Sequence, residues 1–359
     1  MLLKGFLAAM CLVAAIRGSG EIILEQPKEY GVYQRNDKNV ATIPVLIANT
    51  PRISSIRYRY YWGVDKNESA WQNLEFSQKG DHATTSCVLP AGGWYKLEFG
   101  IAAVDSPQTI ITVGHVGVGE VFITAGQSNS ANWGEPKQKC QTGMVVAFNG
   151  HDWQLANDPM PICGGKGGSI WPLVGDALAT RLQVPIGFLC LGVGSSSVRQ
   201  WDPNSPSPDL ADSKSLDGLY QRFIKKYVPL LKPYGYRAVL WHQGETDREM
   251  RSSLYYKLLK NLITTFQAEF AHASWMVAII GNQWMNPEYG KGCRAAQTQL
   301  INEQVAAPGP DTDQLGEKYR QLNGRSSHFN QEGLSAHAQM WVNAIMQEFF
   351  KNERTAHEN

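Results

Sequence analysis

The 359-residue sequence lacks the features that mark several large classes of protein. Its 33 Lys and Arg balance 32 Asp and Glu, so the net charge of +1 indicates neither a nucleic-acid partner nor an anionic membrane surface. It contains no Cys-x-x-Cys and no His-Glu-x-x-His, the common spacings of zinc ligands, so we expect no metal. After residue 20 there is no run of about 18 apolar residues, so we expect no membrane partner once the leader is removed.

The first 20 residues have the pattern of a secretory signal peptide. Lys4 supplies a positive start, and residues 6–16 form an apolar segment that is too short to span a bilayer. Gly18 and Gly20 are the small residues that a cleavage site needs. We therefore expect a secreted or periplasmic protein that is soluble after the signal peptide is removed.

Cysteine is scarce, with six in the chain, and one of them, Cys11, lies in the leader. The remaining odd number leaves at least one thiol unpaired in an exported protein. Cys190 lies in an apolar run and is interpreted as a small buried hydrophobic residue. Cys140 and Cys163 lie in loop-like sequence, and we expect this pair to form a disulfide.

Hydrophobic periodicity divides the mature chain into two regions. Residues 21–115 alternate apolar and polar positions between frequent turns, which predicts a small β-sandwich-like N-terminal domain. From residue 116 to residue 359, short apolar runs alternate with helical patterns. We expect helices near residues 171–183, 216–231, 254–270, 293–305 and 334–349. Repeated β-α units predict a parallel sheet flanked by helices, with ligands at the carboxyl ends of the strands.

The most informative stretch is residues 120–136. The apolar run 121–123 predicts a buried strand, and Gly126 allows a sharp turn after it. Ser128 then follows at what we expect to be the start of a helix, where backbone N–H groups are free. A serine in this place can attack a carbonyl while its own N–H helps to hold the oxyanion. An isolated Gly-x-Ser is more often a helix cap, so the assignment depends on other stretches.

Three further stretches supply polar groups at strand ends or before a helix. Residues 192–197 are a Gly/Ser-rich turn after the second expected strand. Residues 241–247 follow the third strand and hold an amide and two carboxylates, and residues 327–330 place a histidine just before the last helix. Each stretch alone is most simply an ordinary turn or cap, and the function rests on the combination.

Together these stretches resemble the SGNH hydrolases, in particular the branch of the sialate O-acetylesterases and the family 6 carbohydrate esterases, which include acetylxylan esterases. Gly126-Gln127-Ser128-Asn129-Ser130 matches the nucleophile motif of that branch, His242-Gln243-Gly244-Glu245 its third block, and His328-Phe329-Asn330 its last. The resemblance covers roughly residues 116–350 and implies an SGNH-hydrolase (flavodoxin-like) parallel sheet. The Gly-x-Ser-x-Gly elbow of the α/β-hydrolases is absent, because position 130 is serine.

The resemblance also implies a role for particular residues. Ser128 would be the nucleophile and His328 the general base and acid of an acyl-enzyme mechanism. The N–H groups of Ser128 and Gly194, with the side-chain amide of Gln243, would form the oxyanion hole. The expected substrate is an acetylated carbohydrate of the sialic acid or acetylated xylan type, and no metal or organic cofactor is required.

One position departs from the wider family. Many SGNH hydrolases carry an aspartate three residues before the histidine, and Arg325 stands there in this chain. The acid that orients His328 must therefore come from elsewhere or be missing. Glu245 is the first candidate and Asp247 the second, and we expect Arg325 to point away because a cation would disfavour the imidazolium.

Two alternative functions remain open from the sequence. One is an SGNH esterase that acts on lipid or small acyl esters, although no long apolar lid segment is present. The other is a non-catalytic carbohydrate-binding protein derived from a hydrolase, which Arg325 favours. Tryptophans in loop-like sequence suit stacking on sugar rings; these are Trp133, Trp153, Trp171 and Trp201.

Overall fold

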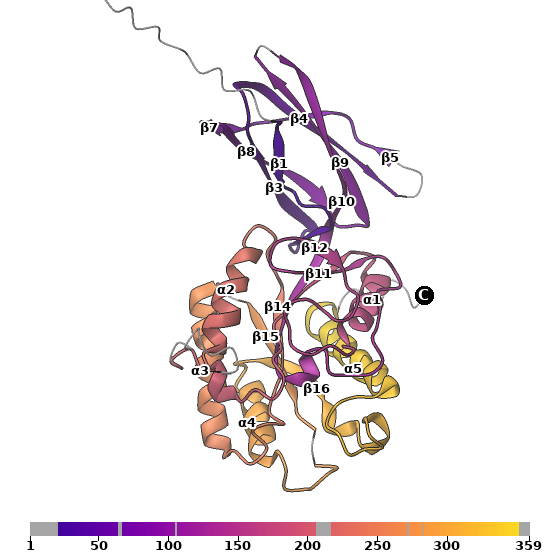
Figure 1. The fold of residues 1–359 in the computed structure, drawn as a ribbon, viewed down its shortest axis with the longest axis vertical. Helices are drawn as coiled ribbons and strands as arrows, with labels where there is room; N and C mark the ends of the chain where they lie inside the picture. Colours follow the sequence, from indigo (N-terminus) through magenta and orange to yellow (C-terminus); the bar gives the residue numbers. More distant parts are fainter. Residues whose placement is uncertain are drawn as a thin grey trace, which may run out of the picture.

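The computed structural model describes residues 21–63, 67–104, 106–205, 217–270, 273–281 and 283–351. The expected signal peptide, residues 1–20, lies outside the described residues, so secretion stays a prediction. Figure 1 shows an antiparallel part at one end of the molecule and an α/β part at the other. Strand β10 (Ser106–Gly126) runs from the first part into the second.

The N-terminal part is all-β, as the alternating sequence predicts. One sheet has the order β1 (Ile23–Gln26), β3 (Val40–Ala48), β8 (His82–Pro90) and β7 (Ser77–Lys79). The strands around β4 pair as a second group, made of β4 (Ile53–Trp62), β5 (Asn67–Glu68), β6 (Gln72–Leu74), β9 (Trp94–Ala103) and the start of β10. Ile43, Val45 and Ile47 of β3 and Leu97 and Phe99 of β9 are buried, so each strand turns one face to the core.

Strand β10 joins the two parts in one continuous element. It pairs antiparallel with β9 over its first half, then parallel with β2 (Gly31–Gln34), and finally with two strands of the α/β sheet. The expected boundary at residues 115 and 116 therefore falls inside a strand. At the junction the fully buried Glu120 pairs with Arg35 at 2.6 Å and with Arg237. A buried carboxylate needs such partners, and here they tie the two parts together.

The α/β sheet has the order β12-β11-β13-β10-β14-β15-β16. The strands are β11 (Val145–Phe148), β12 (Trp153–Leu155), β13 (Ile186–Cys190), β14 (Ala238–His242), β15 (Ser274–Ile279) and β16 (Ala307–Asp311). Only the edge strand β12 pairs antiparallel within this path. We did not expect β11, β12 or β16 from the sequence. The segment of β16 is Ala-Pro-Gly-Pro-Asp, whose residue types disfavour strands.

Helices cover both faces of this sheet (Figure 1). Val121 and Ile123 of β10 face one core, with α3 (Ser252–Phe270) and α4 (Lys291–Asn302). Phe122 faces the other core, with α1 (Trp171–Leu182) and α5 (Gln331–Phe349). The alternation follows from the two-residue period of a strand. No helix in the described ranges is long and apolar enough to cross a membrane.

The segment near residues 216–231, which we expected to be one helix, is irregular. It consists of η3 (Tyr220–Ile224), α2 (Lys225–Tyr227) and η4 (Val228–Leu231), with π, α and 3₁₀ hydrogen bonding in turn. Pro229 lies at the start of η4 and has no N–H to donate, which ends the α-helical hydrogen bonds.

The expected disulfide is wrong, because Cys140 and Cys163 are both free. Cys140 lies against Asp176, with 3.5 Å between Sγ and Oδ1. Cys163 is buried, and Asn132 Nδ2 donates to its sulfur at 3.2 Å. Hydrogen bonds hold this long loop in place of a disulfide: the Asp158 carboxylate accepts from Gln138 N, Ser169 N and Ser169 Oγ. Cys190 is fully buried, as expected.

Candidate active site

The nucleophile candidate lies directly after the central strand β10. Gly126 has φ 125°, and a Cβ there would lie 2.1 Å from the carbonyl oxygen of His242, so only glycine fits. Gln127 N donates to that carbonyl at 2.9 Å, which ties the turn to β14. Ser128 then begins η1 (Ser128–Ser130), a single 3₁₀ turn. Our expectation of a full helix at this point is therefore wrong, although the serine lies at the expected strand end.

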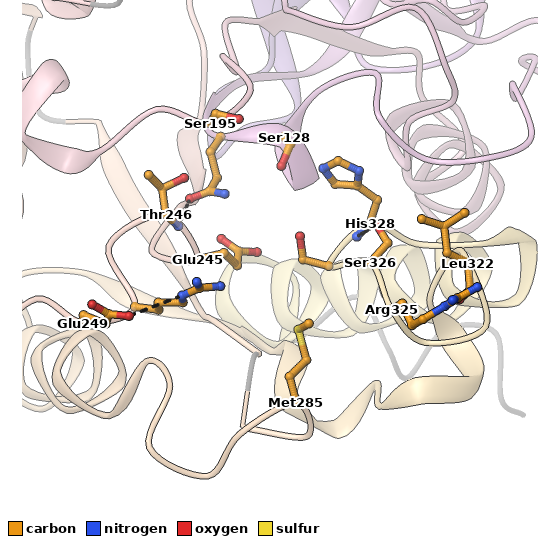
Figure 2. A pocket seen from close by; sticks show the side chains of 13 residues that line it. Ser128, Ser195, Glu245, Thr246, Glu249, Met285, Leu322, Arg325, Ser326 and His328 are labelled. Carbon is orange, nitrogen blue, oxygen red and sulfur yellow. Dashed lines mark hydrogen bonds and ion pairs between the residues drawn. The ribbon is translucent and has the colours of Figure 1, made fainter.

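Ser128 borders an open cavity of about 710 Å³ at the carboxyl edge of the sheet (Figure 2). The lining comes from the loops after β10, β13, β14 and β15 and from the loop before α5. The lining residues are Gln127, Ser128, Ser195, Glu245, Thr246, Arg248, Glu249, Met285, Leu322, Arg325, Ser326, Ser327 and His328. The parallel sheet thus brings all four sequence motifs to one cavity. The Gly/Ser-rich turn of residues 192–197 reaches the cavity through Ser195.

His328 lies on the same cavity as Ser128, and Figure 2 shows the two side chains at the same end of it. Its ring lies 5.5 Å from the ring of Trp133, centroid to centroid. No hydrogen bond joins Ser128 and His328 among the described residues; catalytic hydrogen bonds in ligand-free sites are often long. Burial lowers the pKa of His328, Glu245 opposes this shift, and the charge of Arg320 adds to it. The neutral imidazole that a general base requires is therefore favoured at neutral pH.

A buried arginine that we did not single out from the sequence anchors the loop of His328. Arg320 is 2% exposed and donates to the carbonyls of Leu315 at 2.9 Å, Thr312 at 3.1 Å and Ser327 at 2.6 Å. Burial lowers its pKa to about 10, so it keeps its charge at neutral pH. Because it donates to the carbonyl of the residue before His328, Arg320 holds the backbone of the loop that carries the imidazole.

We expected Glu245, our first candidate for the acid, to contact His328, but the described part of the structure shows no such contact. Its Oε1 accepts from Asn129 Nδ2 at 2.7 Å and from His242 Nε2 at 2.9 Å, and no hydrogen bond joins it to His328 in the described chain. Burial raises its pKa, but the charge and hydrogen bond of His242, with the bond from Asn129, outweigh this and lower the pKa to about 2. Its other oxygen, Oε2, is buried without a partner. Glu245 is thus an ionised carboxylate beside the cavity, and Asn129 is a contact that the sequence did not reveal.

Arg325 turns away from His328, as expected. It is exposed, and its Nε donates to the carbonyl of Leu322 in its own loop at 3.1 Å. Figure 2 shows its guanidinium beside Leu322, on the far side of the loop from the imidazole. The chain therefore carries a permanent cation at the cavity where many SGNH hydrolases have the triad acid.

Asp247, our second candidate, is also committed elsewhere. Its Oδ1 accepts from Ser197 Oγ at 2.6 Å, and its Oδ2 accepts from Val198 N and Gln243 Nε2, each at 2.7 Å. These bonds tie the loop after β13 to the loop after β14. Asp247 is therefore an anchor of the loop that carries Gly194 and makes no contact with His328 in the described chain.

The oxyanion hole differs from our expectation in one group. Gln243 is fully buried, and its Nε2 donates to Asp247 and, at 3.0 Å, to the carbonyl of Ser196. Its amide hydrogens are thus used inside the protein, and the expected role of Gln243 is wrong. Gly194 packs against Trp133, where a Cβ would come within 2.7 Å of Trp133 Nε1, and it is not among the residues that line the cavity. The roles of the Ser128 and Gly194 N–H groups stay predictions.

Gln127 is a further cavity residue to which sequence reasoning gave no role. It is 3% exposed, and its Oε1 accepts from Gly244 N at 3.2 Å, Thr246 N at 3.1 Å and Gln243 Nε2 at 3.3 Å. Its place beside the nucleophile in the motif was the one available signal. In the described ranges no group of three or more His, Cys, Asp or Glu side chains is placed to hold a metal ion.

This arrangement can perform acyl transfer. A serine hydroxyl and a neutral imidazole share one end of the cavity, and an ionised carboxylate also lines it. A family model described as "Carbohydrate esterase, sialic acid-specific acetylesterase" matches residues 118–347, which is nearly all of the α/β part. No curated protein sequence is similar enough to the chain to count as a match.

Solved structures provide a comparison of the fold. A carbohydrate acetylesterase from Xanthomonas citri has 18% identity and a TM-score of 0.57, over 89% of this chain and 73% of that one. A family two carbohydrate esterase from Cellvibrio japonicus has 12% identity and a TM-score of 0.38, over 91% and 97%. A lipase/acylhydrolase from Enterococcus faecalis has 13% identity and a TM-score of 0.40, over 64% and 96%. The first of these shares the fold of this chain, and the expected fold class is confirmed.

Proposed function

The chain belongs to the sialic acid-specific acetylesterase family of carbohydrate esterases, and from this we infer that it removes O-acetyl groups from carbohydrate through a covalent acyl-enzyme on Ser128. It is a carboxylic ester hydrolase, so the interpretation as an enzyme is confirmed and the non-catalytic alternative is set aside. The observation that carries the mechanism is the presence of Ser128 and His328 on one cavity, at the same end of it (Figure 2).

The proposed reaction uses His328 twice. Its neutral imidazole takes the proton of Ser128 Oγ as that oxygen attacks the acetyl carbon, and the carbonyl oxygen becomes an oxyanion. The N–H groups of Ser128 and Gly194 hold the oxyanion. His328 then protonates the departing sugar oxygen, which leaves an acetyl ester on Ser128. Water, deprotonated by His328, attacks this ester and releases acetate, and the proton returns to Ser128.

Glu245 has the charge, though not the direct contact, that the imidazolium requires. We propose that its negative charge stabilises His328 when the histidine is protonated, because Glu245 already acts to raise the pKa of His328. Its Oε2 is fully enclosed and has no partner among the described residues, so the carboxylate acts on the ring through its charge. Asn129 and His242 hold the carboxylate in place through Oε1.

Two arginines favour an acidic sugar, as in sialic acid, over neutral acetylated xylan or a lipid ester, although the carboxylates of Glu245 and Glu249 line the same cavity. Arg325 and Arg248 both line the cavity. Arg325 has no ion-pair partner among the described residues, and Arg248 approaches Glu249 only at 4.0 Å. A guanidinium with free N–H groups is suited to a sugar carboxylate. A panel of acetylated sialic acid, acetylated xylan and a longer-chain ester separates the three substrates by kcat/KM.

The acyl-enzyme is tested by intact mass spectrometry during turnover of a chromogenic acetyl ester. We expect the wild-type protein to carry one acetyl group on Ser128, and Ser128→Ala to carry none and to have no turnover. The substitution is small and lies at a turn, so the thermal unfolding curve of the variant should match that of the wild type. Wild-type turnover in Ser128→Ala would remove Ser128 as the nucleophile.

We also propose that the protein is exported, because residues 1–20 have the pattern of a signal peptide. Fractionation of the expressing cells and mass spectrometry of the mature N-terminus test this. We expect the protein outside the cytoplasm with a new N-terminus near Glu21. Retention in the cytoplasm with an intact Met1 would contradict export without affecting the proposed chemistry.

A further inference from the structure

We propose that Gln127 is a catalytic residue whose side-chain amide donates a hydrogen bond to the acyl oxygen of the substrate in the transition state. The proposal rests on the proposed function, because it assigns a third donor to the oxyanion hole of that esterase. It gives Gln127 the role that the sequence had suggested for Gln243.

The orientation of the Gln127 amide is determined by its partners. Its Oε1 accepts from two backbone N–H groups, Gly244 N at 3.2 Å and Thr246 N at 3.1 Å. A backbone N–H can only donate, so a flipped amide would set its own NH₂ against both donors. The oxygen therefore faces the loop after β14, and the nitrogen faces the opposite way.

The nitrogen, Nε2, has no acceptor in the part of the chain that the structure describes. Buried side-chain amides in proteins are almost always satisfied, and Gln127 is 97% buried, since only 3% of it is exposed. Nε2 is not among the fully enclosed atoms that lack a partner, so it reaches the cavity that Gln127 lines. A ligand in this cavity is what satisfies the amide, and the nearest reactive group along the chain is the adjacent Ser128.

The neighbouring Gln243 explains why one glutamine is free and the other is not. Gln243 Nε2 donates to Asp247 Oδ2 at 2.7 Å and to Ser196 O at 3.0 Å, and it also lies 3.3 Å from Gln127 Oε1. Gln243 thus packs against the oxygen side of the Gln127 amide. Gln127 is held on its oxygen side by the backbone N–H groups of Gly244 and Thr246 before substrate arrives, as the preorganised geometry of an oxyanion donor requires.

Gln127→Glu tests the proposal with an isosteric change. A carboxylate keeps the oxygen that Gly244 N and Thr246 N require, and it replaces the NH₂ by an oxygen that cannot donate when ionised. We expect kcat on a neutral chromogenic acetyl ester to fall by about 10²–10³-fold with KM unchanged, the usual effect of losing one oxyanion donor. Gln127→Met, which removes the donor without adding charge, should also lower kcat. Gln331→Glu adds the same charge at an exposed site on α5 and should keep wild-type kinetics.

The outcomes separate this proposal from the proposed function. If the wild type is active, Ser128→Ala is inactive and both folded Gln127 variants keep wild-type kcat, Gln127 is not a donor to the oxyanion. A loss confined to KM would also overturn the proposal, because it would assign Gln127 to ground-state binding. If the wild type and Ser128→Ala behave alike, the serine esterase mechanism fails, and this proposal fails with it. Thermal unfolding of each variant shows whether it is folded.

Discussion

Replacing Glu245 by Gln should slow turnover of an acetyl ester by about 10²-fold, the lower end of the range for general acid–base assistance. Replacing a triad acid that is hydrogen-bonded to its histidine lowers kcat by about 10⁴-fold. Glu245 makes no such bond, since its Oε1 is held by Asn129 at 2.7 Å and by His242 at 2.9 Å. It acts on His328 through its charge, so we expect the smaller loss.

The same substitution should change the pH dependence in a defined direction. Glu245 raises the pKa of His328, so its removal lowers that pKa further. The active form of His328 is neutral and is present above its pKa. The acid limb of kcat/KM should therefore move to lower pH in Glu245→Gln, while the plateau falls because the imidazolium of the transition state loses its counter-charge. A loss caused by misfolding would lower the plateau without this shift.

The measurement is a pH profile of kcat and kcat/KM for the wild type, Glu245→Gln and a matched control. Glu249→Gln removes the same charge from the same cavity, but the Glu249 side chain is 79% exposed, so water and salt screen its charge. We expect kcat, kcat/KM and their pH profiles in Glu249→Gln to be much closer to those of the wild type. Wild-type kcat in Glu245→Gln would refute the proposal that Glu245 stabilises the protonated His328, and His328 would then work with Ser128 alone. A fall in kcat near 10⁴-fold would instead indicate a direct hydrogen bond between Glu245 and His328.

The remaining predictions concern the groups around this pair. The acid limb of wild-type kcat/KM should have its midpoint below about 6.5, the ordinary pKa of histidine, because burial lowers the pKa of His328. Asp247→Asn should lower the denaturation midpoint in urea and also kcat without moving the pH profile, because Asp247 accepts from Ser197, Val198 and Gln243 in the anchored loop. Arg325→Gln should raise KM for acetylated sialic acid and leave KM for a neutral acetyl ester unchanged; equal effects on both would contradict carboxylate binding. Arg320→Met should cost about 1–3 kcal/mol in urea denaturation, since the carbonyl of Leu315 loses its donor, whereas Thr312 O keeps Leu315 N and Ser327 O keeps Asn129 Nδ2.

Local patterns in the sequence were sufficient for the elements that build the site. The apolar run before Gly126 indicated the central strand, and the alternation of strands and helices indicated a parallel sheet with its ligand site at the carboxyl edge. The resemblance to the SGNH hydrolases, and not this rule, implied that Ser128 and His328 act together, and both line one cavity. The predictions of the central strand and the parallel sheet held because periodicity and turn residues act over a few positions of the chain.

The contacts inside the site were decided by the tertiary structure. Glu245 binds Asn129, which lies 116 positions away, and Gln243 binds Ser196 and Asp247 in place of facing the cavity. The strand at β16 forms from Ala-Pro-Gly-Pro-Asp because β15 offers it an edge. Residue types and spacing determine which groups reach the site. The direction in which a buried amide or carboxylate turns depends on partners from distant segments, because a buried polar group takes whichever orientation satisfies its hydrogen bonds.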